Sequence, residues 1–484
     1  MPSHKNKNTP EIQETSNRQS EPSNSCPDRG VSRRSVLAAG LVAAPLIVSR
    51  YVLGGPGYQA PSDTLRIAAV GIGGMGGAYL KGCNSERIVA LCDLDHERAA
   101  KVFATYPTAA RYRDFREMLD KEAKNFDALI IATPDHTHTL ILMAAVKLGK
   151  HIYCAKPITH TVGEARKVAK ALSLNSHLVT KSSVQSSGTE NARSSTELLR
   201  SGVLGPVREV HVWSDHPAYP CSLLRPAETQ TPPAGMDWDL WIGPAPFRPY
   251  HSTYHPLTWR PWWDFGSGAV GDVGCHTFHF YFKELQLEAP ATIHGSPSAR
   301  QEGWFKQVST PECASVASMV TWEFPARGSL PPLSVHWYDG GLRPHRPVEL
   351  DHRLALPAAG VLFVGDHGKL ITSYGGGYPF GPRGHKLSGG LLLPEEKFKD
   401  FVQPPPALRR VEDHYKEWTQ ACKTGAKTVC PIEFGCEMTE MALLGALALR
   451  TGRVLEWDAK AMKVANSDQA DGLIDPPYRA GWSL

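Results

Sequence analysis

Three polar side chains in this sequence have the types and spacing that proton transfer requires. Lys156 follows the apolar run HIYC and precedes Pro157, so we expect it at the end of a strand and not in a helix. Asp272 and His276 are four residues apart in a helix-like stretch, which places both on one face. An imidazole beside a carboxylate can take a proton from an alcohol, and an ammonium group can stabilise the resulting alkoxide. Lys156, Asp272 and His276 are the predicted catalytic residues; a solvated lysine and an ordinary helical pair are the alternatives.

A glycine cluster between an apolar run and a helix-like segment predicts a dinucleotide site. The stretch VGIGGMGG contains Gly71-x-Gly73-x-x-Gly76, a turn that brings a pyrophosphate to a helix N-terminus. Asp93 ends the next apolar run, 20 residues after Gly73, where a carboxylate binds the ribose hydroxyls of NAD and repels the 2′-phosphate of NADP. The predicted cofactor is therefore NAD, with NADP as the alternative. The residues predicted to bind it here are Gly71, Gly73, Gly74, Met75, Gly76 and Asp93.

The stretch ATPDHTH, residues 132–138, follows a third strong apolar run. In an open α/β sheet the ligand crevice lies beyond the carboxyl ends of the strands, so this stretch and Lys156 are expected to border the cofactor. Pro134 can carry the chain past it. The residues predicted to contact the cofactor at this edge are Thr133, Pro134, His138 and Lys156.

Neither the histidines nor the cysteines predict a metal centre. His136 and His138 stand at a helix start, where histidine is commonly a cap or a surface residue, and no third ligand accompanies His276 and His279. The ten cysteines are scattered without CxxC pairs, and several lie in apolar runs. They are predicted to be buried thiols of a protein that folds in a reducing compartment.

The stretch before Asp272 is rich in aromatic residues. Flat rings stack on the C–H faces of sugars while nearby polar groups hydrogen-bond to hydroxyls, which favours a carbohydrate site; burial of the rings in a core is equally supported. The aromatic residues are Trp238, Trp241, Tyr250, Tyr254, Trp259, Trp262 and Trp263, with His255 and Arg260 among them. The residues predicted to bind the substrate are Lys156, Arg260, Trp263, Asp272 and His276.

The elements that must position these residues fall into two regions after a leader. From 63 to 184, apolar runs alternate with helix-like segments, which predicts a doubly wound parallel sheet, that is, an NAD(P)-binding Rossmann domain. From 185 to 484, strand-like runs follow one another between a few helices. This pattern predicts an α+β domain with a large, mostly antiparallel open sheet that binds substrate.

Residues 1–62 are predicted to be a polar leader, an export signal and a linker. Arg33 and Arg34 precede an apolar run over 36–48, which is shorter than the roughly 18 residues of a membrane span. The paired arginines predict twin-arginine export to the periplasm; an uncleaved anchor, or a cytoplasmic location if the signal is not used, are the alternatives. A net charge of +4 without a Lys/Arg stripe gives no case for a nucleic-acid partner.

Four motifs occur in an order that resembles the Gfo/Idh/MocA family of sugar and cyclitol oxidoreductases: the glycine pattern, TPDHTH, AKP at 155–157 and D-x-x-x-H at 272–276. The likeness runs from about residue 64 to the end. It implies a Rossmann domain, a C-terminal open sheet used for homo-oligomer contacts, Lys156 and His276 as the catalytic pair, and Asp272 as a substrate or orienting residue. The usual motif is E-K-P. Ala155 replaces its glutamate and can make none of its hydrogen bonds, so a variant active site is expected.

Together these features predict an NAD(P)-dependent oxidoreductase acting on a hydroxyl of a sugar, sugar derivative or cyclitol. Free nicotinamide cofactor is scarce outside the cytoplasm, so an exported enzyme is expected to carry its cofactor tightly bound and to recycle it. One version oxidises one sugar and reduces another. A second oxidises a ring hydroxyl, eliminates a neighbouring substituent and re-reduces the product, which cleaves a glycoside. A non-catalytic exported sugar-binding homologue is the competing class.

Overall fold

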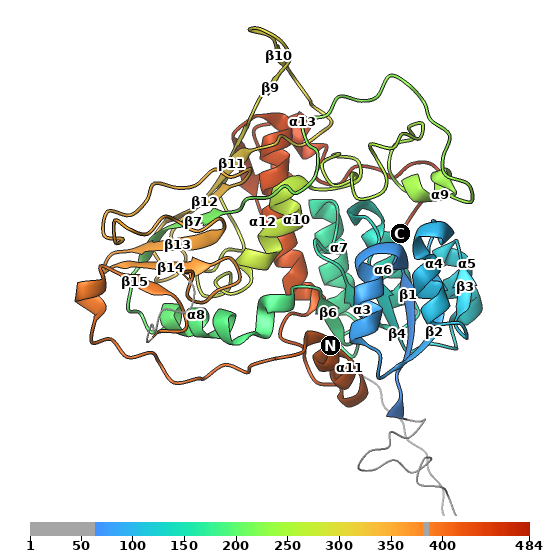
Figure 1. Cartoon of the computed structure of the whole chain (residues 1–484), viewed down its shortest axis with the longest axis horizontal. Coiled ribbons are helices and arrows are strands. Elements are labelled where there is room, and N and C mark those ends of the chain that lie inside the picture. The colour runs from blue at the N-terminus through green and yellow to red at the C-terminus, as the bar shows by residue number, and fades with distance from the viewer. Residues whose placement is uncertain (1–62, 381–386) are drawn as a thin grey trace, which may run out of the picture. The chain divides into compact units, whose positions relative to one another are not determined.

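The computed structural model describes residues 63–380 and 387–484, so the predicted leader, paired arginines and linker lie outside the described residues. The described residues fold around two large β-sheets (Figure 1). None of the helices in these two ranges has the length and apolar character needed to cross a bilayer.

The first sheet is parallel and has the strand order β3-β2-β1-β4-β5-β6. Its strands are β1 (Arg66–Val70), β2 (Arg87–Cys92), β3 (Ala110–Tyr112), β4 (Ala128–Ile131), β5 (His151–Cys154) and β6 (Thr180–Ser182). Strands β1 and β4 are almost wholly buried, as expected for strands covered on both faces. The order reverses between β1 and β4, so a ligand crevice is expected beyond their carboxyl ends. The predicted doubly wound sheet is confirmed.

Capped helices connect these strands. They are α3 (Gly77–Gly82), α4 (His96–Thr105), α5 (Phe115–Glu122), α6 (Asp135–Lys147) and α7 (Val162–Ser173), and a tight helical turn over Ile72–Gly76 precedes α3. The carboxylates of Asp95 and Asp114 cap α4 and α5, and Thr161 with Glu164 forms a capping box on α7. Local sequence therefore determines where these three helices begin and where the strand-to-helix turns lie.

The second sheet has the order β15-β14-β13-β7-β12-β11-β8-β16-β17, and in it β7 and β12 are parallel while the other pairs are antiparallel. Its strands are β7 (Val207–Trp213), β8 (Thr292–Pro297), β11 (Ser318–Phe324), β12 (Leu333–Tyr338), β13 (Gly360–Gly365), β14 (Lys369–Ser373), β15 (Leu391–Leu393), β16 (Leu455–Asp458) and β17 (Lys463–Val464). A small hairpin, β9 (Arg300–Gln301) and β10 (Gln307–Val308), stands apart from it. The predicted large, mostly antiparallel sheet is confirmed.

Helices pack on one face of the second sheet. The remaining helices are α8 (Glu190–Arg200), α9 (Trp238–Ile242), α10 (Gly268–Phe278), α11 (His414–Thr424), α12 (Ile432–Thr451) and α13 (Asp468–Asp471), with short 3₁₀ turns at Gln185–Gly188 and Glu395–Phe398. In β12, Leu333, Val335 and Trp337 are buried against this helical layer, whereas His336 and Tyr338 alternate to the other face. Helix α12 contacts α10 and α7 as well as β8 and β11, so it joins the two sheets (Figure 1).

Late parts of the chain complete the Rossmann core. Trp418 of α11 packs with the residues of β1 and β4, and Ile432 of α12 packs with those on the other face of the same sheet. Lys181 of β6 and Glu417 of α11 form a buried ion pair at 2.5 Å. The boundary expected at 184/185 stays a prediction, and these contacts tie α11 and the start of α12 to the first sheet.

The nine cysteines in the described residues are unpaired, and all but Cys422 are buried. Burial raises the pKa of these thiols, for example that of Cys83 to about 12, so they are protonated at neutral pH. The prediction of buried thiols is confirmed for these eight. Cys26 lies outside the described residues.

Candidate active site

A cavity of about 190 Å³ opens where the order of the first sheet reverses. Lys156 reaches it from β5, and Arg260 and Asp272 reach it from the second half of the chain. The cavity is also lined by most of the residues predicted to bind the cofactor: Gly71, Gly73, Gly74, Met75, Asp93, Thr133 and Pro134. The predicted cofactor and catalytic residues therefore meet in one place, with Gly76, His138, Trp263 and His276 outside the lining.

The glycine turn depends on close backbone packing. Gly71 has φ 82°, and a Cβ there would lie 2.7 Å from the backbone of Ala132 and Thr133. A Cβ on Gly76 would lie 2.2 Å from the carbonyl oxygen of Gly71. Gly76 thus packs against Gly71 on the side of the turn away from the cavity lining. Gly73 and Gly74 face the cavity, where their backbone can approach a pyrophosphate.

Asp93 lies beside the glycine turn at the end of β2. Its Oδ2 accepts a hydrogen bond from the N–H of Gly73 at 2.7 Å, and its Oδ1 accepts one from Asp95 at 2.9 Å. Burial raises the pKa of this carboxyl group, and the two backbone donors oppose that shift. The carboxylate is therefore held in place next to the cavity, where a ribose hydroxyl of NAD would reach it.

Arg98 was not predicted, although it also lines this end of the cavity. Its side-chain stem would lie 3.0 Å from a Cβ on Gly73. An arginine near the ribose is the usual means of binding the 2′-phosphate of NADP. Asp93 therefore favours NAD, whereas Arg98 favours NADP. The sequence feature that could have identified Arg98 is its position in the first turn of the helix that follows Asp93.

His136 and His138 fix the backbone around the cavity. The ring nitrogens of His138 lie 2.9 Å from the carbonyl oxygen of Pro157 and 2.8 Å from that of Thr133. Those of His136 lie 3.0 Å and 3.3 Å from the carbonyls of Trp241 and Phe265. Burial lowers the pKa of both histidines. His138 thus holds residues that border the cavity and does not itself face into it.

Lys156, Asp272 and Arg260 form the charged end of the cavity. The Nζ of Lys156 lies 2.5 Å from Oδ1 of Asp272, and the Nε of Arg260 lies 3.5 Å from its Oδ2. Burial opposes ionisation of Asp272, but the charges of Lys156 and Arg260 outweigh it and lower the pKa of the carboxyl group. An ionised carboxylate flanked by two cations can orient a substrate hydroxyl and hold an alkoxide.

His276 follows Asp272 by one helical turn on α10, as the spacing predicted. It lies outside the cavity lining, with the ring of Tyr374 at 6.1 Å. Burial and the charge of Lys156 lower the pKa of His276 to about 3. Its imidazole is therefore neutral at physiological pH, the form that can accept a proton.

Asp135 is a site residue that the sequence analysis missed. It is buried at the first position of α6 and lines the cavity, and its Oδ2 accepts a hydrogen bond from the hydroxyl of Ser267 at 2.8 Å. Burial, together with the charge of Asp272, raises the pKa of this carboxyl group to about 7. Ala155 also borders the cavity and brings only a methyl group, so the acidic groups at this end are Asp135 and Asp272. The sequence feature that could have identified Asp135 is its place as the acidic residue of TPDHTH.

Two distant segments close the cavity. His255, in the loop before α10, lies 3.0 Å from Oδ2 of Asp95, and Trp259 of the same loop lines the cavity. From the C-terminal tail, Trp482 lines the cavity and stacks on Arg116 at 4.6 Å. Figure 1 shows α9 and the C-terminus beside the helices of the first sheet. The cavity is thus bounded by parts of the chain that are far apart in sequence.

Most of the aromatic residues form a small core of their own. Its buried rings are Trp238, Trp241, Tyr250, Tyr254 and Trp262, and Trp238 stacks on Trp241 with ring centroids 4.6 Å apart. Trp263 is buried in the larger core of the second sheet. Packing, one of the two alternatives, therefore accounts for these rings. Trp259 is half-buried and carries Arg260 over its face at 4.5 Å. Trp263 borders a second cavity of about 210 Å³ with His160 and Arg450.

Two family models match the chain. The first, an oxidoreductase family NAD-binding Rossmann fold, matches residues 65–182, and the second, an oxidoreductase family C-terminal alpha/beta domain, matches residues 197–293 and 396–484. Inositol 2-dehydrogenases are among the similar proteins. The one from Rubrobacter xylanophilus is 32% identical over 117 residues, and the one from Azotobacter vinelandii is 29% identical over 113. These matches span 23% and 22% of this chain and 33% of each relative.

Solved structures share the fold at low sequence identity. The WlbA dehydrogenase from Bordetella pertussis, in complex with NADH and UDP-GlcNAcA, has a TM-score of 0.54 at 13% identity, over 82% of this chain and 99% of that one. Aldose-aldose oxidoreductase from Caulobacter crescentus has a TM-score of 0.50 at 16% identity, over 81% of this chain and 100% of that one. With two matched domains, a shared fold and an NAD-binding Rossmann domain, the chain belongs to the Gfo/Idh/MocA family of oxidoreductases.

Proposed function

We propose that this protein is an NAD-dependent oxidoreductase that acts on a hydroxyl group of a sugar, sugar derivative or cyclitol. The observation that carries the proposal is the cavity with the glycine turn and Asp93 at one end and the pair Lys156–Asp272 at the other. The relatives named inositol 2-dehydrogenase support a polyhydroxylated substrate. NADP is the alternative cofactor, because Arg98 adjoins Asp93.

Each residue of the site has a separate role in the proposed reaction. NAD, when bound, accepts the hydride from the carbon that bears the hydroxyl. The ammonium of Lys156 donates a hydrogen bond to the hydroxyl oxygen and stabilises the developing alkoxide. Asp272 keeps that ammonium in position at 2.5 Å. We assign the hydroxyl proton to the neutral imidazole of His276, which lies outside the cavity lining but one helical turn after Asp272. The products are a carbonyl group and the reduced cofactor.

We further propose that the cofactor is tightly bound and recycled on the enzyme. The loop with His255 and Trp259 and the tail with Trp482 also line the cavity, which favours slow release of a dinucleotide. Arg33 and Arg34 support export by the twin-arginine route, where the folded protein would carry its cofactor along.

The first test is to denature the purified protein and assay the supernatant for NAD(H) and NADP(H). About one equivalent of NAD(H) per chain, together with oxidation of a sugar or cyclitol, is the expected result. A protein that binds sugar but neither retains nor binds a dinucleotide would overturn the proposal in favour of the binding homologue.

Solvent exchange separates two enzymatic versions. Transfer between two sugars leaves the carbon next to the oxidised one untouched, whereas oxidation followed by elimination acidifies its C–H bond. Turnover in D₂O without deuterium at that carbon supports transfer between sugars. Deuterium there, with a cleaved glycoside, supports the elimination route.

A further inference from the structure

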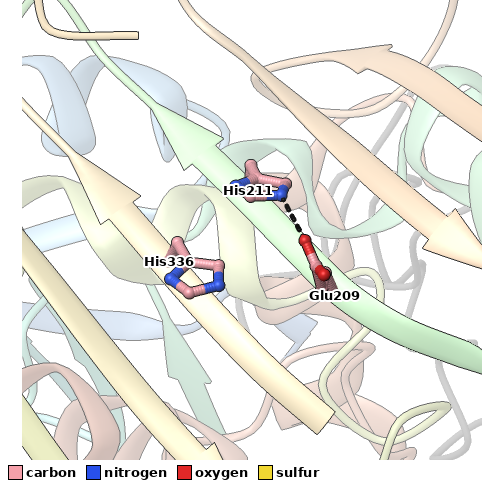
Figure 2. Close-up of side chains that lie close together, drawn as sticks. All are labelled: Glu209, His211 and His336. Atoms are coloured by element: carbon pink, nitrogen blue, oxygen red, sulfur yellow. Dashed lines mark hydrogen bonds and ion pairs between the residues drawn. The ribbon is translucent and has the colours of Figure 1, made fainter. Parts of the chain in front are cut away.

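A cluster of potential metal ligands lies on the second sheet, apart from the NAD cavity (Figure 2). Glu209 and His211 are two residues apart on β7 and therefore share one face, and His336 on β12 is paired with His211 in the parallel ladder. One ligand atom from each residue lies within 4.8 Å of the others. None of the three residues lines the cavity described above.

Each imidazole ring contacts a hydroxyl group through its Nδ1, so its Nε2 does not take part in that contact. The Nδ1 of His336 lies 2.9 Å from the hydroxyl of Thr321, and the Nδ1 of His211 lies 3.2 Å from that of Tyr338. The rings stack with centroids 4.8 Å apart and planes 18° apart. Metal-binding histidines are usually oriented in this way by a hydrogen bond at the second ring nitrogen.

The charge and the exposure of the cluster suit a divalent cation. Glu209 supplies a negative charge, with an oxygen 3.1 Å from Nε2 of His211. The side chain of Glu209 is 50% exposed and that of His211 is 16% exposed, so an ion can enter from solvent.

The strands beneath the cluster are fixed by the core on the other face of the sheet. Val210, Val212, Val335 and Trp337 alternate with the three ligands and are fully buried against the helical layer. Two ligands therefore project from strands whose register is set by burial. The side chain of Glu209 is half exposed and can rotate, whereas the two stacked rings need to approach each other to share one ion.

We propose that Glu209, His211 and His336 form a binding site for Zn²⁺. Two imidazoles and one carboxylate are a common zinc ligand set, and they leave a fourth tetrahedral position for water or a further ligand. The alternative is that the three side chains form only a hydrogen-bonded network on the sheet. Zn²⁺ binding would draw the ligand atoms closer together than 4.8 Å, because Zn–N bonds are about 2.0–2.1 Å long.

Calorimetric titration of the full-length, chelator-treated protein with ZnCl₂ tests the site. The expected result is one Zn²⁺ per chain, and a weakening of at least about tenfold in each of His211→Gln, His336→Gln and Glu209→Gln. Co²⁺ in place of Zn²⁺ should give visible absorption bands of a tetrahedral ion, which the three variants lose. His352→Gln is the matched control, since 90% of the side chain of His352 is exposed.

The same experiment can overturn the proposal. Absence of stoichiometric Zn²⁺ binding by the wild-type protein, or equal affinity in the three variants, would leave only the hydrogen-bonded network. If a histidine variant fails to fold, Glu209→Gln decides, because its side chain is half exposed. The amount of retained NAD is measured alongside and should be the same in all variants, so this result is separate from the proposed enzymatic function.

Discussion

Lys156 and Asp272 constrain each other, because each places its charge 2.5 Å from the opposite charge in a largely buried setting. The contact links residues 116 positions apart in sequence. Removal of Asp272 leaves the ammonium of Lys156 without its carboxylate partner, whereas removal of Lys156 leaves Asp272 beside Arg260 at 3.5 Å. A variant at Lys156 should therefore affect chemistry more than cofactor retention.

Lys156→Ala is expected to lower kcat by about 10²–10³, the usual effect of removing one donor that stabilises an oxyanion. The amount of NAD released on denaturation should remain that of the wild-type protein. Steady-state oxidation of the best sugar or cyclitol provides the measurement. Lys167→Ala, which changes an exposed lysine paired with Asp475, is the control. An unchanged kcat in Lys156→Ala would show that Lys156 has no catalytic role.

Asp135 predicts an unusual dependence of stability on pH. Its pKa is about 7 in the folded protein and about 3.9 in the unfolded chain, so the folded state binds the proton more tightly. Its contribution to stability is complete below about pH 4 and is lost as pH rises to 7. Asp135→Asn should therefore be more stable than wild type at pH 8, by at most about 4 kcal/mol, and equal to it near pH 4.

Urea unfolding of Asp135→Asn and wild type at pH 4, 6 and 8 measures this difference. Asp120→Asn, a substitution at an exposed position on α5, is the control and should leave the pH dependence unchanged. A stability difference that is independent of pH would contradict the raised pKa of Asp135.

At the scale of elements, the site is built from strand-to-helix turns whose geometry is local. The turn after β1 needs glycine at Gly71 and Gly76 for lack of space, and α10 presents Asp272 and His276 one turn apart. Such elements tolerate substitutions on their exposed side. They do not tolerate an added side chain where their backbone packs directly against other backbone atoms.

Gly76→Ala is expected to abolish NAD retention and to destabilise the protein by about 1–3 kcal/mol, because its Cβ would lie 2.2 Å from the carbonyl oxygen of Gly71. Gly472→Ala is the matched control. Both glycines have helical φ, −58° and −62°, but a Cβ on Gly472 has no neighbour closer than 3.4 Å. Full NAD content in Gly76→Ala would show that the turn can open.

At the scale of the whole molecule, the cavity depends on segments that reach it from both ends of the described chain. The C-terminal tail brings Trp482 to the rim, and Arg479 fastens the tail to Asp239 of α9 at 2.5 Å. The tail therefore adds to the barrier that a bound dinucleotide must cross.

Trp482→Ala is expected to raise the rate of NAD dissociation by about tenfold or more, as one large ring contact is worth roughly 1.5–3 kcal/mol of burial. Stopped-flow displacement of bound NADH fluorescence is the measurement. Trp304→Ala is the control, because Trp304 is 92% exposed near the β9–β10 hairpin. Equal dissociation rates in the two variants would remove the tail from cofactor retention.

Replacement of Arg33 and Arg34 by lysine tests the proposed export. The variant should accumulate in the cytoplasm with its cofactor bound, because the twin-arginine route requires the paired arginines. Cell fractionation with immunoblotting measures the location. If the wild-type protein were found only in the cytoplasm, the proposal of cofactor recycling would lose its basis. The proposed oxidoreductase activity would be unaffected.

Features that depend on neighbours along the chain can be predicted from one sequence. Apolar runs, caps and glycines specify β1, β2, β4, β5 and β6 and the turn at Gly71–Gly76. The short edge strand β3, with the sequence ARY, has no apolar run and was not predicted. The i,i+4 spacing of Asp272 and His276 required only a helix, which α10 is. These features follow from local sterics and periodicity, so one sequence suffices to predict them.

The tertiary structure alone decided which distant residues meet. Neither periodicity nor composition brings Lys156 to Asp272, Trp482 to the cavity or His336 to His211, since each contact depends on how two sheets and a long loop pack. Burial likewise decided the protonation of Asp135 and the packing of most of the tryptophans. Desolvation and long-range charge are properties of the folded arrangement, and no short stretch of sequence contains them.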